Sequence, residues 1–274
     1  MKSTIEAAIR RANQQRRCAF IPFLTAGFPD RSTCVEILVA LADSGADVIE
    51  VGLPFSDPLA DGPTIQSAGK QALDSGVTPD VVLEIVAAAK KRMSAPVVLM
   101  TYLNPILRAG AENFAAKARE AGVSGVIVPD LPPEEADDWL EAAAKHELDT
   151  IFMAAPTTPL DRVKTIAGRT SGFLYYVSMT GVTGSALVVS GEVLSHIEQV
   201  RGLSRVPVAV GFGVSTPEQA RTLSDTADGV IVGSALIREV QSQREPAEAV
   251  RAAGRLAASL SAALYRPNGD HVTD

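Results

Sequence analysis

The sequence of 274 residues is poor in the residues that build disulfide frameworks and metal sites, with two cysteines and three histidines. Cys18 and Cys34 fall in a predicted strand and a predicted helix, and nothing about them indicates a disulfide framework. His146 and His196 fall in predicted helices and His271 lies near the C-terminus, so the histidines do not cluster as metal ligands do. We therefore expect no metal site and assign the histidines no role.

Positive charge and long apolar runs are scarce as well. The net charge of −7 argues against nucleic acid and against an anionic membrane as partners. No apolar run approaches the roughly 18–20 residues that a membrane-spanning helix needs. The charged segment 1–17 precedes an apolar run, but Pro22 and Thr25 interrupt that run, whereas the core of a signal peptide is continuous. The sequence therefore predicts a cytoplasmic protein.

What the sequence does contain is a regular alternation of strand-like and helix-like segments. An amphipathic helix is predicted at 3–16, ahead of the first strand. Strands are predicted at 19–24, 47–52, 96–101, 125–129, 149–153, 172–178, 206–211 and 228–232. Helices are predicted between and after them at 31–44, 78–93, 110–121, 134–146, 159–168, 191–201, 216–224 and 244–263.

Eight such units, with nearly continuous apolar strands, predict an α/β fold of the (β/α)8 TIM-barrel type. A doubly wound open sheet is the competing fold, but it rarely has so many strands in so even a series. No shift in composition marks a second domain, so we predict one barrel domain over 1–265 with an extra N-terminal helix. The polar segment 266–274 is predicted to be a disordered tail.

The segment at residues 48–62, VIEVGLPFSDPLADG, holds the strongest functional signal. Glu50 is a single carboxylate within a buried apolar strand, where an unpaired charge is costly. Asp61 follows on a loop rich in proline and glycine. A carboxylate on a rigid strand and a second one on a loop can divide acid and base roles. The alternative for Glu50 is a buried ion pair that orders the core.

The lysines exclude one kind of barrel chemistry. A Schiff-base aldolase needs a lysine at the end of a strand, inside the barrel mouth. The seven lysines instead lie in helical stretches or at the N-terminus: Lys2, Lys70, Lys90, Lys91, Lys117, Lys145 and Lys164. What remains is a phosphorylated substrate handled by carboxylates.

Glycines at two strand ends predict where the phosphate binds. Strand seven ends in Gly211-Phe212-Gly213, and strand eight is followed by Gly233-Ser234 and a short helical stretch. Backbone N–H groups without side chains can approach phosphate oxygens, and a helix N-terminus favours negative charge. Thr216 stands where a GxGxxG fingerprint would have its third glycine, and a nucleotide P-loop sequence is missing.

Two further features belong to the predicted mouth. The long connection from Met179 to Ser190 has almost no charge and suits a mobile lid, although an ordinary surface loop is the alternative. An apolar slot for a flat ring is predicted from residues near the strand ends, with ordinary barrel packing as the alternative. These slot residues are Phe23, Met100, Met153, Tyr175 and Phe212.

These motifs resemble those of tryptophan synthase alpha chains over roughly residues 16–262. The similar segments are FIPFLTAGFPD, VIEVGLPFSDPLADG, VPDLPPEE, GVTG, GFGVS and VGSALI. The resemblance implies a TIM barrel that cleaves indole-3-glycerol phosphate to indole and glyceraldehyde 3-phosphate. It also implies an alpha2-beta2 assembly with a pyridoxal-phosphate-dependent beta chain, which receives the indole through a tunnel, and no cofactor in this chain.

The resemblance also implies roles for single residues. Glu50 and Asp61 match the family's catalytic carboxylates. The other matching positions are Thr183 and Gly184 in the closing loop, Gly213, Gly233 and Ser234 in the phosphate cradle, and Phe23, Tyr175 and Phe212 along the indole slot. Met179 departs from the pattern, because some members have a basic residue there; this departure concerns only the docking of the loop.

In the implied retro-aldol step, Glu50 carries the protons and Asp61 accepts the ring N–H. Two other functions stay open at this point: a free-standing indole-3-glycerol phosphate lyase, and a catalytically silent barrel that activates a partner. Asp57 lies on the same loop as Asp61 and has no place in the chemistry. We expect it to couple the loop to the beta chain, with a turn-forming aspartate as the alternative.

Overall fold

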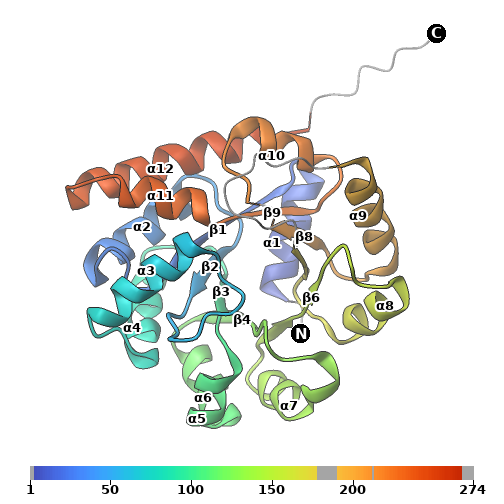
Figure 1. Ribbon diagram of the computed structural model, residues 1–274, viewed down its shortest axis with the longest axis horizontal. Coiled ribbons are helices and arrows are strands. Elements are labelled where there is room, and N and C mark those ends of the chain that lie inside the picture. The colour runs from blue at the N-terminus through green and yellow to red at the C-terminus, as the bar shows by residue number, and fades with distance from the viewer. Residues whose placement is uncertain (1–2, 178–189, 212, 267–274) are drawn as a thin grey trace.

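Short runs of β-branched and aliphatic residues form a barrel of parallel strands in the computed structural model, which describes residues 3–177, 190–211 and 213–266 (Figure 1). Within these residues the strands are β1 (Ala19–Thr25), β2 (Ile49–Gly52), β3 (Val97–Met100), β4 (Val123–Ile127), β5 (Asp149–Ile151), β6 (Met153–Ala154), β7 (Leu174–Val177), β8 (Val208–Gly211) and β9 (Gly229–Val232). Every strand pairs with its neighbours in parallel.

The strand order shows how the barrel closes. It runs β5-β4-β3-β2-β1-β9-β8-β7-β6, so its two ends are β5 and β6. Only Phe152 separates these two strands in the sequence. The fifth predicted strand therefore changes partners at this residue, pairing with β4 before it and with β7 after it, and the order closes on itself.

Side chains alternate between two apolar layers, as the pleat of a strand requires. The inner layer includes Ile21, Val98, Ile127 and Phe173, and the outer layer, between strands and helices, includes residues such as Leu24. Near the carboxyl ends of the strands the inner layer changes character. There Met100, Met153 and Tyr175 are only partly buried against the inner core.

The helices surround the sheet, in the order in which they follow the strands (Figure 1). In the described residues they are α1 (Thr4–Gln14), α2 (Arg31–Asp43), α3 (Pro63–Asp74), α4 (Pro79–Lys90), α5 (Leu103–Ala109), α6 (Ala111–Glu120), α7 (Asp137–Lys145), α8 (Leu160–Arg169), α9 (Gly191–Leu203), α10 (Pro217–Ser224), α11 (Ser234–Gln241) and α12 (Pro246–Ala263), with the short 3-10 helix η1 (Pro133–Glu135).

The first helix lies across the amino ends of the strands. Its buried residues pack on the inner layer. Ser3, just before α1, donates a hydrogen bond to Asp149 at the start of β5, and Asn13 donates one of 2.9 Å to the carbonyl of Asp228 before β9. The amino end of the barrel is therefore closed, and the carboxyl end is left for function.

The predicted barrel and the N-terminal helix are confirmed, and the structure adds two helices that we did not predict. Pro63 occupies the first turn of α3, where its missing N–H costs nothing, and Pro105 lies in the first turn of the short α5. The predicted helix 134–146 is divided into η1 and α7. Arg266, the first residue of the predicted tail, donates a hydrogen bond of 2.8 Å to the carbonyl of Ser224, and residues 267–274 lie outside the described residues.

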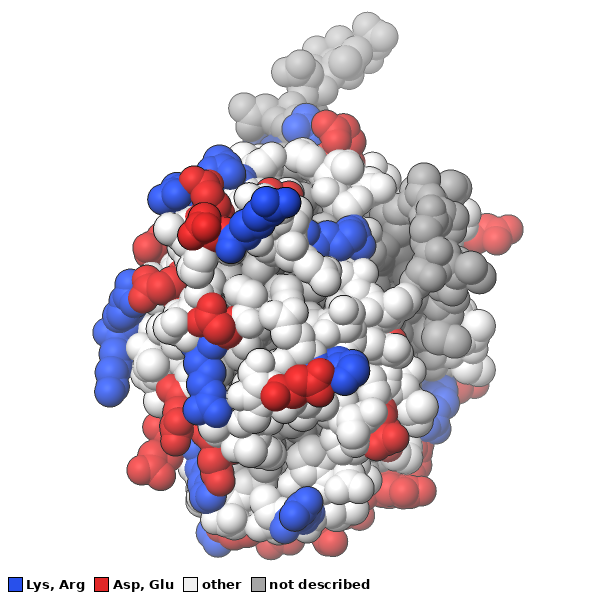
Figure 2. All heavy atoms as spheres, turned by 60° about the vertical axis from the view of Figure 1, so that its left-hand side comes forward, with Lys and Arg blue, Asp and Glu red and all other residues white. Residues whose placement is uncertain are grey.

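The helical surface carries both signs of charge. Lys and Arg are interspersed with Asp and Glu over the face shown in Figure 2. Ion pairs such as Lys117 with Asp80, at 2.9 Å, join neighbouring helices. The described residues of this face form no extended basic patch of the kind that binds nucleic acid. Within the described chain, none of the helices has the length and apolar character to cross a membrane.

Candidate active site

Glu50 projects from β2 into the barrel and is 1% exposed. It lies beside Phe23 of β1 in the register of the two strands. Its Oε2 is buried and has no hydrogen-bond partner within the described part of the chain. A buried ion pair is therefore not what holds this side chain, and the carboxyl group is available to a ligand.

The environment of Glu50 favours its neutral form. Burial, and to a smaller extent the nearby charge of Asp61, raise the pKa of Glu50 to about 8. At neutral pH this carboxyl group therefore holds its proton for most of the time. It can act first as an acid and then, once the proton has left, as a base.

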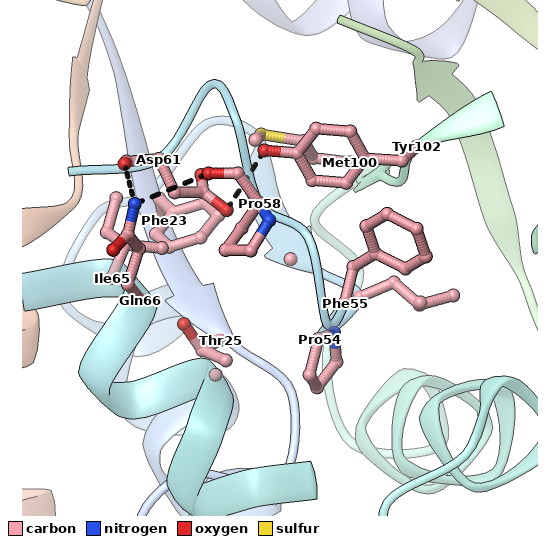
Figure 3. Close-up of a pocket in the computed structure, with 13 residues that line it drawn as sticks. Phe23, Thr25, Pro54, Phe55, Pro58, Asp61, Ile65, Gln66, Met100 and Tyr102 are labelled. Atoms are coloured by element: carbon pink, nitrogen blue, oxygen red, sulfur yellow. Dashed lines mark hydrogen bonds between the residues drawn. The ribbon is translucent and has the colours of Figure 1, made fainter. Parts of the chain in front are cut away.

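Asp61 reaches the same region from the loop between β2 and α3. Burial raises the pKa of Asp61 to about 6, although a hydrogen bond from Tyr102 lowers it. The Tyr102 hydroxyl donates this bond to Oδ2 over 3.3 Å (Figure 3). It also accepts a hydrogen bond of 2.9 Å from the backbone N–H of Ala60. Asp61 is therefore mostly ionised at pH 7, while Glu50 is mostly protonated.

The end of the loop is fixed from α3 as well. The Gln66 amide donates a hydrogen bond of 2.8 Å to the carbonyl of Asp61 and a longer one of 3.5 Å to the carbonyl of Pro58 (Figure 3). Phe55 stacks on Tyr102 with ring centroids 5.1 Å apart. Tyr102 and Gln66 did not emerge from the sequence. The one signal that could have indicated Tyr102 is its position just after the end of a barrel strand.

Two of the residues predicted for the ring slot line one cavity, and two others lie on the neighbouring strands β6 and β7. Phe23 and Met100 line a cavity together with Asp61 (Figure 3). Tyr175 is close enough to both carboxylates for their charges to raise the pKa of its phenol, after burial as the larger cause. Met153 pairs with Tyr175 in the register of β6 and β7.

The predicted phosphate residues lie at the carboxyl ends of the adjacent strands β8 and β9. Gly213 has φ +67°, a backbone conformation that favours glycine, and a Cβ added there would meet nothing within 4 Å among the described residues. Gly233 is the N-cap of α11 and Ser234 is its first residue, and no described side chain caps this helix. The N–H groups of its first turn can therefore donate hydrogen bonds to a bound anion.

Several predicted residues do not form part of the site described above. Met179, Thr183 and Gly184 of the predicted closing loop lie outside the described residues, and so does Phe212. Asp57 is exposed, and its carboxylate accepts a hydrogen bond of 2.6 Å from Ser56.

The three histidines lie away from this mouth or outside the described chain. The ring of His196 contacts the Tyr176 hydroxyl at 2.7 Å, and that of His146 contacts Glu112 at 2.7 Å. These two side chains are thus partly buried and paired. Groups of three or more His, Cys, Asp or Glu that could hold a metal ion do not occur among the described residues.

Two carboxyl groups with separated pKa values, at the carboxyl-terminal mouth of a parallel barrel, are the arrangement expected of a TIM-barrel enzyme. Comparison with known proteins identifies the family to which this enzyme belongs. The family model for the tryptophan synthase alpha chain matches residues 9–264. The chain therefore belongs to the tryptophan synthase alpha chain family. It is an indole-3-glycerol phosphate lyase of tryptophan biosynthesis, and the family predicted from the sequence is confirmed.

Individual relatives agree over almost the full length. The tryptophan synthase alpha chain of Gloeobacter violaceus is 51% identical over 225 residues, covering 82% of each chain. That of a Picosynechococcus species is 45% identical over 263 residues, covering 96% of this chain and 99% of the relative. Among solved structures, the alpha chain of Legionella pneumophila matches with a TM-score of 0.88 at 38% identity, covering 98% of this chain and all 100% of that one. A structure of Mycobacterium tuberculosis tryptophan synthase matches with a TM-score of 0.89 at 38% identity, covering 97% and 100%.

Proposed function

We propose that Glu50 moves the protons in the cleavage of indole-3-glycerol phosphate and that Asp61 stabilises the charge that develops on the indole ring. The observation that carries this proposal is the buried Glu50 carboxyl group, with a pKa of about 8 beside an ionised Asp61. Its Oε2 has no hydrogen-bond partner among the described residues. The two carboxyl groups are held in opposite protonation states at neutral pH, as an acid and an electrostatic stabiliser must be.

The reaction is a retro-aldol cleavage in which the indole ring receives the electrons. Protonated Glu50 delivers its proton to ring carbon 3, and Asp61 accepts a hydrogen bond from the ring N–H as positive charge builds up on the ring. The Glu50 carboxylate then removes the proton of the side-chain hydroxyl group. The electrons of that O–H bond form the aldehyde of glyceraldehyde 3-phosphate, the carbon–carbon bond breaks, and its electrons restore the aromatic indole. Glu50 ends the cycle protonated, as it began.

The substrate is held at both ends in this proposal. The ring lies along Phe23 and Tyr175, with Phe212 as a further expected contact. The phosphate lies against Gly213 and at the first turn of α11, where Gly233 and Ser234 contribute backbone N–H groups. Thr183 and Gly184 are proposed, by resemblance, to close over the substrate.

The partner is proposed to be a tryptophan synthase beta chain in an alpha2-beta2 assembly, which holds the pyridoxal phosphate. The related M. tuberculosis structures are described as tryptophan synthase, two of them in an aminoacrylate-bound form. The carboxyl face of the barrel is suited to docking, because Leu59 is 91% exposed on the loop that carries Asp57 and Leu107 is 68% exposed on α5. A free-standing lyase would show the same cleavage rate with and without a beta chain, which separates the two functions.

The two buried free cysteines are consistent with the predicted cytoplasmic location.

The experiment that tests the proposal is the substitution Glu50→Gln in the isolated chain. The fold and substrate binding are expected to stay, while turnover falls at least about a hundredfold, the usual scale for a lost acid–base group. Asp57→Asn is the matched control, since it removes an exposed carboxylate from the loop after the same strand. If Glu50→Gln keeps more than a tenth of wild-type turnover at saturating substrate, Glu50 is not the proton carrier.

A further inference from the structure

The Phe23 ring lies between two glycines on the neighbouring strands. The base of the Phe23 side chain lies against Gly233, which follows β9. A Cβ added to Gly233 would lie 3.1 Å from Cδ1 and 3.4 Å from Cβ of Phe23. The tip of the ring is over Gly52, the last residue of β2: a Cβ there would lie only 2.6 Å from Cζ and 2.7 Å from Cε2. Non-bonded carbon atoms do not approach so closely, so the ring occupies the space of a side chain at residue 52.

The backbone does not explain the glycine at residue 52. Gly52 continues the regular pairing of β1 with β2, opposite Thr25. Other residues adopt the extended conformation of a strand without strain. The ring of Phe23 is therefore the physical reason why a side chain does not fit at residue 52.

A cavity borders the Phe23 ring in the described part of the chain. The backbone at Gly233 lies behind the base of the Phe23 side chain, and Leu24 and the rest of β1 fix the backbone of Phe23 in the sheet. The open side is the cavity that Phe23 and Gly52 line together with Asp61 and Met100 (Figure 3). A side chain at residue 52 would push the tip of the ring into that cavity.

We propose that Gly52 and Gly233 form a seat for the Phe23 ring and thereby set the width of the cavity that receives the substrate's aromatic ring. Gly52 is then a specificity-determining position that acts through Phe23. This inference rests on the proposed role of Phe23 in binding the indole ring. It adds that the Phe23 ring keeps its position because residues 52 and 233 have no side chains. A side chain at residue 52 is therefore compatible only with a smaller residue in place of Phe23.

The test compares Gly52→Ala in two backgrounds, wild type and Phe23→Leu, in the isolated chain. The measurements are the KM for cleavage of indole-3-glycerol phosphate and the inhibition constant of glycerol 3-phosphate, which probes the phosphate end alone. In the wild-type background Gly52→Ala is expected to raise KM about tenfold or more, the scale of an overpacked contact. In the Phe23→Leu background the same change is expected to alter KM less than about threefold, because the shorter side chain no longer reaches residue 52. Glycerol 3-phosphate inhibition should stay within about threefold throughout.

Gly202→Ala is the matched control. Gly202 lies on α9 and is not among the residues that line this cavity, and a Cβ there would meet nothing within 4 Å outside its own helix turn among the described residues, so its KM should stay within about threefold of wild type. An unchanged KM for Gly52→Ala overturns the inference, and so does an equal loss in both backgrounds. If Gly52→Ala does not fold, recovery of folding and cleavage in Gly52→Ala/Phe23→Leu supports the seat, and failure of that pair overturns it. A KM for Phe23→Leu equal to that of wild type removes Phe23 from the ring site and with it this inference, while the roles of Glu50 and Asp61 stand on their own test.

Discussion

The phenol of Tyr102 donates a hydrogen bond of 3.3 Å to Oδ2 of Asp61 and accepts one of 2.9 Å from the N–H of Ala60, the residue before it. One side chain from the connection after β3 therefore holds both the carboxylate and the backbone of the loop after β2. Phe55, from the start of that loop, stacks on the same ring. The position of Asp61 and its pKa thus depend in part on one tyrosine that joins two βα connections.

Tyr102→Phe keeps the ring and its stacking and removes both hydrogen bonds. The bond from Tyr102 lowers the pKa of Asp61, so its loss should raise that pKa and move the low-pH limb of kcat/KM to higher pH. We expect turnover at pH 7 to fall by about threefold to tenfold, since more Asp61 is protonated. Phe55→Leu is the control, because it weakens the stacking and leaves the hydrogen bonds; its low-pH limb should stay in place. A purely structural role for Tyr102 would lower turnover at every pH alike.

The pH dependence of the wild-type chain should be bell-shaped. Activity requires ionised Asp61 and protonated Glu50, so kcat/KM should rise as pH increases through about 6 and fall as it increases through about 8. The substrate phosphate also titrates, with a second pKa of about 6. Asp61→Asn distinguishes the two: a low-pH limb that persists in the residual activity of this variant belongs to the phosphate.

The raised pKa of Glu50 also predicts how stability changes with pH. The carboxyl group has a pKa of about 8 in the folded chain, against an ordinary value of 4.5, so between these values the folded state binds more protons than the unfolded state. Stability of the wild type therefore falls as pH rises through this window. Glu50→Gln lacks this loss. Its Tm relative to wild type should increase between pH 5 and pH 9 by more than about 4 °C, because each pKa unit corresponds to about 1.4 kcal/mol. A constant difference in Tm would show that Glu50 ionises freely in the folded chain.

The sequence predicted the barrel because most of its strands are short, apolar and evenly spaced, a pattern that few other folds share. It predicted Glu50 because a lone carboxylate in an apolar strand is unusual, and the structure shows why this position is costly: Oε2 is buried without a partner in the described chain. These inferences needed only local sequence and the general rule that barrels function at the carboxyl ends of their strands.

What the sequence could not predict depends on segments that return to each other in space. Tyr102 and Gln66 reach the Asp61 loop from other connections, and no spacing in the sequence encodes those contacts. The break at Phe152 arises because one strand changes its partner from β4 to β7, which its composition does not record. Helix α3 was missed because its first residues continue a loop rich in proline and glycine.

The phosphate cradle is best tested at Ser234, the first residue of α11. A larger residue at Gly233 would first meet Phe23, so it would not report on the phosphate alone. Ser234→Asp places a negative charge at the helix N-terminus, which the helix dipole tolerates but a bound phosphate repels. We expect the inhibition constant of glycerol 3-phosphate to rise about tenfold or more, while indole binding changes little. Ser234→Asn is the uncharged control of equal size and should keep most of the affinity. Equal losses for both variants, or for both ligands, would place the phosphate elsewhere.

The last prediction concerns Asp57 and the partner. Its side chain is exposed, its carboxylate is bonded to Ser56, and the neighbouring Leu59 is almost fully exposed on the same loop. This loop ends at Asp61, so a beta chain that docks on it through a basic residue would shift the position of a proposed catalytic carboxylate.

Because Asp57 is four residues from Asp61 and takes no part in the proposed chemistry, Asp57→Asn should leave the cleavage rate of the isolated chain within about twofold of wild type. With saturating beta chain, the activation of cleavage should fall by about threefold or more, on the scale of one lost charge pair at an interface. The measurement is the ratio of cleavage rates with and without beta chain, and Ser56→Ala, which removes the intrachain partner of Asp57, is the control that should keep this ratio. Activation as strong as in wild type would refute the coupling, whereas an equal loss in the isolated chain would assign Asp57 to the structure of its own turn.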